Sequence, residues 1–509
     1  MSSSKIKVDE REAFLPWAMG LARWGVSYLW EGGSEVTHLI KERVLFPSYY
    51  TQHPEEKSRS VSEKVAAFIS RSLESGACAG EGLVFFQGLD LQERCFYILP
   101  RLKRAYVISE SEKMLLLLHT ERGGEALSPG YQDILTPVMG ANNMLLCPYS
   151  EHRRLRGVVE RYFTKHQATS RDHFKKIMIA GIKSLHMLFN RQGDDPILHY
   201  VYQVVAKTTL GLLHRDLAEL FKLLPEANKR NPQVKLQLEH FFRCIYNEKR
   251  FKADKALEGL SKSPTLSLDE KISTAILLIT AGTHTTTNSI KCFLNYLELN
   301  PHYREEIRQE WSKFIAGRTV TDPETFFEAF YHFISQSVWL EACCQETLRL
   351  FPVASIISRV AKKSIKLNDV WINEGDEIHL NILAYQRQKE IWGDDAAVYR
   401  PERWLDGKKA PLLNFSSGNQ KCLGVHLAKY EALIFAGLFC IVLNETGPRS
   451  ALNHAGDKME DSGMYFNGFN LESTFTIKPW KYEIPHHIKK MLPCVSEVQG
   501  DMRIPLFLI

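Results

Sequence analysis

The feature that constrains the fold of this chain most is the loop at residues 415–424, which reads Phe-Ser-Ser-Gly-Asn-Gln-Lys-Cys-Leu-Gly. An apolar segment, residues 425–445, follows at once and is predicted to form a buried helix. The loop therefore delivers Cys422 to the first turn of that helix. Unsatisfied backbone N–H groups and the positive end of the helix dipole both favour a thiolate there. We expect Cys422 to be a metal ligand, with an ordinary buried cysteine as the alternative.

Composition excludes several classes of protein. A chain of 509 residues with 44% hydrophobic content can bury a large core, and no Gly/Ser linker, low-complexity tract or internal repeat divides it. The net charge of +5 is mild, and basic residues alternate with acidic ones, which gives no support to nucleic-acid binding. The 10 cysteines include no CxxC pair, so a reducing compartment is expected rather than a disulfide scaffold.

The amino-terminal segment is apolar but short. Residues 13–30 are rich in Leu, Trp, Ala and Gly, yet Arg23 interrupts them and they fall short of the ~20 apolar residues of a spanning helix. The acidic Asp9 and Glu10 argue against a cleavable signal peptide. We expect residues 1–35 to form an interfacial or weakly anchoring segment. The alternative is a helix packed on the body of the protein, and residues 36–509 are expected to form one domain.

Helices dominate the expected secondary structure. Short β-branched and aromatic runs between residues 95 and 118 predict a small sheet, and helical spacing of apolar residues predicts several helices over residues 171–260. A basic helix is expected from Glu151. A longer one should occupy residues 267–300, because Ser267 and Glu270 form a capping-box pattern and Pro301 follows.

The middle of that long helix has an unusual composition. Residues 281–287 read Ala-Gly-Thr-His-Thr-Thr-Thr, and glycine and threonine are poor helix formers. Threonine hydroxyls can bond back to helix carbonyls and open a groove for a small ligand. A tolerated kink in a packed helix is the alternative. Further on, Glu346 and Arg349 lie three residues apart on one helix face, where they can pair, and Arg403 is a distant third partner.

Three motifs in this order resemble those of the cytochrome P-450 family: the Phe-x-x-Gly-x-x-x-Cys-x-Gly loop, the Ala-Gly-x-x-Thr patch and the Glu-x-x-Arg pair. The resemblance covers residues 95–484. It implies a mainly α fold, the triangular helical P-450 domain with a small β-rich region and a long central helix over the haem. The haem b, iron protoporphyrin IX, would have Cys422 as its axial thiolate ligand, within a loop shaped by Phe415, Gly418 and Gly424.

The resemblance also implies roles for the long helix. Ala281 and Gly282 would allow close approach to the haem, and Thr285 would help to deliver protons to iron-bound dioxygen. His284 stands where the family usually has an acidic residue and is similar to the sterol-demethylase group. An imidazole can relay protons near neutral pH.

The remaining implied roles concern structure and charge. Glu346, Arg349 and Arg403 would form the structural triad of the family. Arg153 and Arg359 would bind the haem propionates, with Tyr149 in place of the usual Trp four residues before Arg153. Gln420 stands where the family generally has Arg or His, and it donates hydrogen bonds without charge.

The implied function is that of a monooxygenase acting on a hydrophobic small molecule such as a terpenoid, sterol, fatty acid or secondary metabolite. Electrons from NADPH or NADH would arrive through a reductase or ferredoxin at a basic face. An intracellular site is expected, at the endoplasmic reticulum surface in a eukaryote and in the cytoplasm otherwise. Two alternatives stay open: a haem-thiolate enzyme that rearranges, dehydrates or couples its substrate, and a haem-binding sensor of lipophilic ligands. The basic face comprises Arg154, Arg156, Arg161 and Lys165, and the apolar pocket candidates are Leu135, Val138, Leu277, Val353, Ile356 and Phe469.

Overall fold

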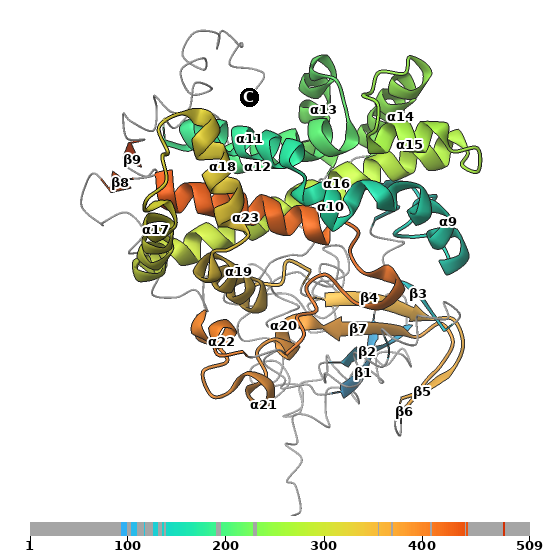
Figure 1. Cartoon of the computed structure of the whole chain (residues 1–509). Coiled ribbons are helices and arrows are strands. Elements are labelled where there is room, and N and C mark those ends of the chain that lie inside the picture. Colours follow the sequence, from blue (N-terminus) through green and yellow to red (C-terminus); the bar gives the residue numbers. More distant parts are fainter. Residues whose placement is uncertain are drawn as a thin grey trace, which may run out of the picture.

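One helix of 32 residues, α16 (Leu268–Leu299), is the axis of the helical part of this computed structural model (Figure 1). It begins at the predicted capping box. Ser267 Oγ accepts the N–H of Glu270 over 3.2 Å, and a Glu270 carboxylate oxygen accepts the N–H of Ser267 over 2.8 Å. It ends before Asn300, since Pro301 opens the next helix. The structure describes residues 93–98, 103–108, 117, 126–130, 135–136, 139–189, 195–227, 232–354, 356–367, 370–407, 410–442, 444–445 and 482–483.

The first half of α16 is surrounded by protein. Every residue from Ile272 to Thr280 is buried, which is the pattern of a helix covered on all sides. Its neighbours are helices from widely separated parts of the chain. They are α12 (Pro196–Tyr202), the π-helix η5 (Gln203–Leu210), α14 (Pro232–Asn247), α19 (Val338–Leu350) and α23 (Val425–Val442).

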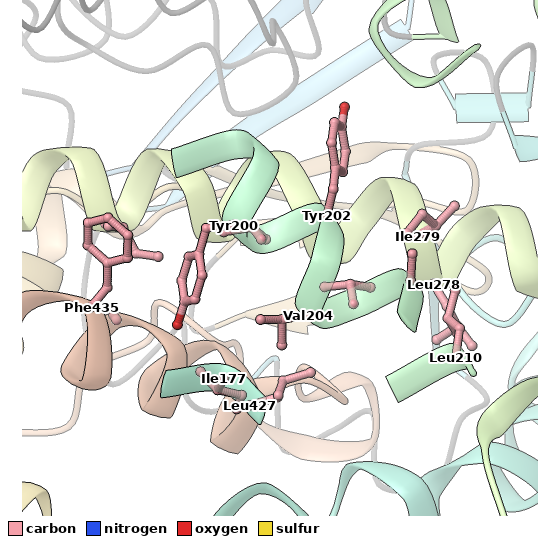
Figure 2. Close-up of a cluster of buried hydrophobic side chains, with 14 of the residues drawn as sticks. Ile177, Tyr200, Tyr202, Val204, Leu210, Leu278, Ile279, Leu427 and Phe435 are labelled. Carbon is pink, nitrogen blue, oxygen red and sulfur yellow. The ribbon is translucent and has the colours of Figure 1, made fainter. Parts of the chain in front are cut away.

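Helix α12 carries side chains in two directions, as Figure 2 shows. Tyr200 points toward α23, where its ring centroid lies 4.9 Å from that of Phe435 and its hydroxyl donates to the Glu431 carbonyl over 3.0 Å. Tyr202 points away from α23. Ile177 of α11 (Arg171–Phe189) belongs to the same apolar core. Helix α12 therefore contacts both α16 and α23.

Shorter helices complete the helical part. Their bounds are α9 (Tyr149–Val159), η4 (Glu160–Phe163), α10 (Lys165–Thr169), α13 (His214–Ala227), α15 (Ala256–Lys262), α17 (Pro301–Ile315), α18 (Pro323–Ile334), α20 (Ile382–Tyr385), α21 (Lys389–Trp392), α22 (Glu402–Leu405) and η6 (Gly418–Gln420).

A five-stranded sheet forms the second part, in the order β1-β2-β7-β4-β3. Its strands are β1 (Glu93–Ile98), β2 (Lys103–Ile108), β3 (Leu127–Pro129), β4 (Ile356–Ala361) and β7 (Glu377–Asn381), and all its pairs are antiparallel except β2 with β7. Two-stranded pairs join β5 (Ile365–Leu367) to β6 (Val370–Ile372), and β8 (Asn444–Glu445) to β9 (Tyr482–Glu483). The sheet predicted near residue 95 is confirmed.

Within the described ranges, no helix combines the length and apolar character needed to cross a lipid bilayer. The segment at residues 1–35, for which interfacial contact was predicted, lies outside those ranges.

Helix α23 buries a carboxylic acid. Glu431 is 1% exposed, and in the described part of the chain neither of its carboxylate oxygens has a hydrogen-bond partner. Burial raises the pKa of Glu431 well above its ordinary value, because the charged form would lose its hydration. The folded protein therefore retains a proton that the unfolded chain releases as the pH rises through about 4.5.

We expect Glu431→Met to stabilise the protein, and to do so more as the pH rises. A group whose pKa is raised on folding contributes full stability below its unfolded pKa and loses it at higher pH. The gain in unfolding free energy should be about 1–3 kcal/mol at pH 8, the cost of an unpaired buried polar group, and smaller at pH 5. Urea unfolding at both pH values measures it. Glu305→Met, at an exposed carboxylate on α17, is the control that should change little. An equal gain in unfolding free energy at both pH values would contradict the ionisation of Glu431 as its cause.

Candidate functional site

The cysteine loop passes twice through the left-handed region of backbone conformation. Ser416 has a φ of 59° and Gly418 a φ of 73°. Glycine adopts this conformation freely, whereas serine adopts it at a cost that the surrounding contacts must offset. The chain then folds back, so that the Cys422 N–H donates to the Phe415 carbonyl over 2.8 Å. Cys422 lies three residues before α23, as the sequence predicts.

Cys422 is exposed, although enough protein surrounds it for burial to raise the pKa of its thiol. The Gly424 N–H and the charges of Arg156 and Lys421 lower the pKa in part. The expected lowering by the helix terminus is therefore outweighed by burial. A metal ion bound to the sulfur would supply the missing stabilisation, since coordination deprotonates a thiol.

A buried ion cluster supports this loop. Glu346, Arg349 and Arg403 are each at most 1% exposed. Arg349 donates to both Glu346 carboxylate oxygens over 2.8 Å, and Arg403 Nε donates to one of them over 2.9 Å. Trp404 Nε1 and the Arg400 N–H add two further bonds of 2.9 Å. The structure thus brings the three triad residues together around one carboxylate.

The remaining guanidinium protons hold the chain that leads to the cysteine. Arg349 donates to the Gln386 carbonyl over 2.9 Å and to the Ala396 carbonyl over 2.6 Å. The Gln386 amide in turn donates to the Arg349 carbonyl over 2.9 Å and accepts the Leu413 N–H over 3.0 Å. Leu413 lies two residues before Phe415. Gln386, which sequence reasoning missed, is therefore the connection between the triad and the loop.

The threonine patch of α16 behaves as predicted in one respect. Thr280, Thr283, Thr285 and Thr287 each donate to the carbonyl four residues earlier, over 2.6 to 2.9 Å. The helix nevertheless continues without interruption. What changes along this stretch is how much of the helix surface other residues bury.

One face of α16 opens where the other stays covered. Ala281 is exposed and Thr285 and Ser289 are half-buried, at a spacing of four residues that defines one face, whereas Thr283 and Thr286 are buried. Leu277 lies on the same face one turn earlier and is buried. The uncovered face is therefore short and begins at Ala281.

Gly282 lies against η5. A Cβ atom at this position would meet Val205 Cγ1 at 3.3 Å, so the absence of a side chain lets the π-helix approach α16 closely. The sequence predicted that this glycine makes room for the cofactor. The structure shows that it makes room for a neighbouring helix.

His284 is 6% exposed and contacts α12. Its Nε2 lies 3.2 Å from the Tyr202 hydroxyl, and the two rings are perpendicular at a centroid distance of 5.9 Å. Burial lowers the pKa of His284 to about 4; the negative charge of Asp195 raises it and the positive charge of Lys291 lowers it further. The imidazole is therefore neutral at physiological pH.

Helix α9 presents a different arginine to the loop from the one predicted. Arg153 is exposed, whereas Arg156, three residues later, donates to the Lys421 carbonyl over 2.7 Å. Four residues before Arg156 stands His152, which is buried, with a pKa lowered to about 4 by burial and by the nearby charge of Arg156. The same four-residue spacing fits both pairs, so spacing alone could not choose between Tyr149–Arg153 and His152–Arg156. Because His152 is buried and Arg153 is exposed, the structure favours the pair His152–Arg156.

The other predicted site residues are placed less specifically. Arg359 of β4 is buried and donates to the Ser358 carbonyl over 3.0 Å. Its charge also lowers the pKa of His152, which places it near α9. Gln420 ends η6 and is half-buried. Among the pocket candidates, Leu135, Leu277 and Val353 are buried, Ile356 opens β4, and Val138 and Phe469 lie outside the described residues.

These residues fit a haem. An iron ion requires an accessible thiol such as that of Cys422, and the flat apolar ring of the haem requires an uncovered surface such as the open face of α16. The two haem carboxylates require positive charges, which the arginines near His152 supply. Thiolate ligation needs no further metal ligand from the protein. In the described ranges, no group of three or more His, Cys, Asp or Glu side chains could hold a metal by itself.

A family model described as Cytochrome P450 matches residues 144–441, more than half of the chain. Among curated relatives, a putative cytochrome P450 CYP13A6 of Caenorhabditis elegans is 29% identical over 37% of this chain and 35% of its own length. Cytochrome P450 monooxygenase ACRTS1 of Alternaria alternata is 29% identical over 30% of this chain and 42% of its own length. Cytochrome P450 3A15 of Cavia porcellus is 24% identical, over 46% and 44%. The chain thus matches less than half of the length of each.

Two solved structures share the fold. The retinoic acid-bound cyanobacterial CYP120A1 has a TM-score of 0.58 and 18% identity, covering 70% of this chain and 86% of its own. P450BioI, in complex with acyl carrier protein carrying hexadec-9Z-enoic acid, has a TM-score of 0.56 and 21% identity, covering 72% and 93%. At these identities the likeness concerns the fold alone.

We expect Glu346→Gln to destabilise the protein by about 3–5 kcal/mol, because it leaves two buried guanidinium groups without their shared counter-charge. Glu341→Gln is a matched control on the same helix, where the carboxylate is 41% exposed and pairs with Lys429. That pair should contribute about 0–1 kcal/mol. Thermal and urea unfolding compare the two variants. Equal losses would show that the buried cluster is not the support of the loop.

Proposed function

The chain belongs to the cytochrome P450 family, and we propose that it is a haem-thiolate monooxygenase that inserts one oxygen atom from O2 into a hydrophobic small molecule. Family membership implies a haem with a cysteine thiolate ligand. Bound to that thiolate, the haem supplies reductive activation of dioxygen. The observation that carries the proposal is the exposed Cys422 residue, held by a loop that the Glu346 cluster supports.

Three groups would hold the haem. Cys422 would be the thiolate ligand, and Phe415, Gly418 and Gly424 would shape the loop around it. Arg156 and Arg359 would neutralise the propionates, with Arg156 taking the role expected of Arg153, because it is the α9 arginine that contacts the cysteine loop. Gln420 would add a neutral hydrogen-bond donor.

The uncovered face of α16 would form the oxygen side of the site. Ala281 has a side chain small enough for a flat ring to approach the helix, and Thr285 offers the hydroxyl nearest to that opening. In the structure this hydroxyl donates to the Ala281 carbonyl over 2.7 Å. Rotation of the hydroxyl would let it donate into the opening instead, so Thr285 is the residue that would hold a proton on the oxygen side of the site.

The substrate would be apolar. Leu277 lies one turn from Ala281 on the same face of α16, and Leu135 and Val353 are two further buried candidates for the pocket. The two proteins of like fold were solved with retinoic acid and with a hexadecenoyl group, both long and lipophilic. We place the substrate of this chain in the broad class of terpenoids, sterols, fatty acids and similar secondary metabolites.

Electrons would come from NADPH or NADH through a partner protein, a reductase or ferredoxin, that docks beside the cysteine loop. Of the predicted basic face, Arg154 is engaged by Glu151 and Glu270, and Arg156 by the loop itself. Arg161 and Lys165 are exposed, as are Arg153 and Lys421. These four exposed cations are the better candidates for contact with an acidic partner.

The absorption spectrum of the reduced protein under carbon monoxide tests the haem-thiolate proposal. We expect a strongly red-shifted band typical of thiolate ligation, and Cys422→Ala should abolish it because no sulfur then reaches the iron. Cys440→Ala, at a buried cysteine of α23, is the matched control and should keep the band. A wild-type band at the position typical of histidine ligation would refute the ligand assignment.

Oxygen insertion is tested separately, by supplying isotopically labelled O2 with NADPH, a reductase and a panel of terpenoids and fatty acids. Products of a monooxygenase carry one labelled oxygen atom. Absence of the label from every product formed would exclude monooxygenation and leave rearrangement or coupling.

The assignment of Arg156 to a propionate can be tested separately. We expect Arg156→Ala to weaken haem retention roughly ten- to a hundredfold, since a charge-assisted hydrogen bond contributes about 1.5–3 kcal/mol. Arg153→Ala should leave retention nearly unchanged, because that side chain is exposed. Transfer of haem from each variant to excess apomyoglobin measures the loss. The reverse ranking of the two variants would restore Arg153 as the propionate ligand.

A further inference from the structure

Helices α12 and α16 are joined by two polar contacts at equal spacing. Tyr202 and Asp195 are seven residues apart at the two ends of α12, and their partners His284 and Lys291 are seven residues apart on α16. The higher-numbered residue of one helix meets the lower-numbered residue of the other, so the helices run antiparallel. Seven residues are close to two turns, which places both contacts on one face of each helix.

The first contact, between Lys291 and Asp195, fixes the start of α12. The Lys291 ammonium, 8% exposed, lies 2.6 Å from one Asp195 carboxylate oxygen. The other oxygen of Asp195 accepts the Leu198 N–H over 3.1 Å and caps α12. One carboxylate therefore sets both the beginning of α12 and its register along α16.

The second contact, between Tyr202 and His284, has a defined donor and acceptor. Tyr202 is buried and stacks on Phe221 of α13 at a centroid distance of 5.0 Å, so its hydroxyl has little freedom to turn elsewhere. Within the described ranges, the hydrogen-bond partner of this hydroxyl is His284 Nε2. A buried hydroxyl requires an acceptor for its proton. Tyr202 must therefore donate to Nε2, which puts the imidazole proton of His284 on Nδ1.

The contact also keeps His284 on the covered side of α16. The face that opens toward the proposed haem begins at Ala281 and contains Thr285, whereas the imidazole is turned to α12 and is perpendicular to the Tyr202 ring. Immediately after Tyr202 the chain enters the π-helix η5, whose Val205 packs on Gly282. The π-helix therefore packs on α16 close to the contact between Tyr202 and His284.

We infer that Tyr202 is a positioning residue for the proposed oxygen chemistry: its hydroxyl holds His284 as the neutral Nδ1–H tautomer, behind the Thr285 face of α16. The inference rests on the proposed function for the role of this contact in oxygen chemistry. The hydrogen bond itself, between Tyr202 and His284, can be tested independently. It gives Thr285, rather than His284, the direct contact with the oxygen side of the site. His284 supports that face from behind, at a fixed tautomer.

The test is nitrogen NMR of the full-length, haem-loaded protein in its diamagnetic ferrous carbon monoxide form, with ¹⁵N-labelled histidine. Comparison with His284→Gln identifies the His284 signals. In the wild type we expect an unprotonated Nε2 and a protonated Nδ1 at pH 7. In Tyr202→Phe, which retains the ring and its stacking on Phe221, we expect the Nε2 signal to shift toward its protonated position.

Tyr246→Phe is the matched control, because its buried hydroxyl donates to the Lys271 carbonyl of the same helix α16 over 3.2 Å. It removes a comparable hydrogen bond and should leave the His284 signals unchanged. Identical His284 signals in Tyr202→Phe and the wild type, or a wild-type imidazole protonated on Nε2, would overturn the inference. Failure of the proposed function would appear instead in the carbon monoxide band and in the oxygen label, with the tautomer unaffected.

Discussion

A single carboxylate with almost no exposed surface, that of Glu346, accepts hydrogen bonds from two arginines, an indole and a backbone N–H. Burying three ionised groups costs several kcal/mol per ion, and only complete pairing offsets that cost. The cluster therefore exists only when α19, the segment that contains Gln386 and Ala396, and α22 are all in place. The loop that carries Cys422 inherits its position from this arrangement through Gln386 and Leu413. The Glu346 cluster is therefore a support of the loop that carries the thiol.

Helix α16 separates two environments along its length. One face begins to open at Ala281, and the opposite side is sealed by α12 and η5 through Tyr202 and Val205. Four threonines along this stretch bond to carbonyls of their own helix; they are Thr280, Thr283, Thr285 and Thr287. A continuous helix can thus contain a run of poor helix formers, because packing rather than propensity maintains it.

The sequence was sufficient for features that depend on local chemistry. The capping box at Ser267, the position of Cys422 before a helix and the convergence of Glu346, Arg349 and Arg403 all follow from residue types at short or family-typical spacing. Features that depend on rotation about a helix axis were out of reach. The spacing on α9 admitted two arginines, and only burial of His152 selects Arg156. The direction of His284 depends on Tyr202, 82 residues away, which no local pattern indicates. The pKa of Cys422 depends on how much protein surrounds the loop, a property of the assembled core.

The hydrogen bond from Arg156 to the Lys421 carbonyl joins residues 265 positions apart in the chain. A ribosome that adds about 5–20 residues per second needs roughly 15–50 s to synthesise that interval. During that time α9 is already made, but the cysteine loop and α23 do not exist. The earlier helices that pack on α23 lack this partner until then, so their apolar surface is exposed to chaperones. Cofactor capture is therefore a late event in the biogenesis of this protein, set by the order of its segments along the messenger RNA.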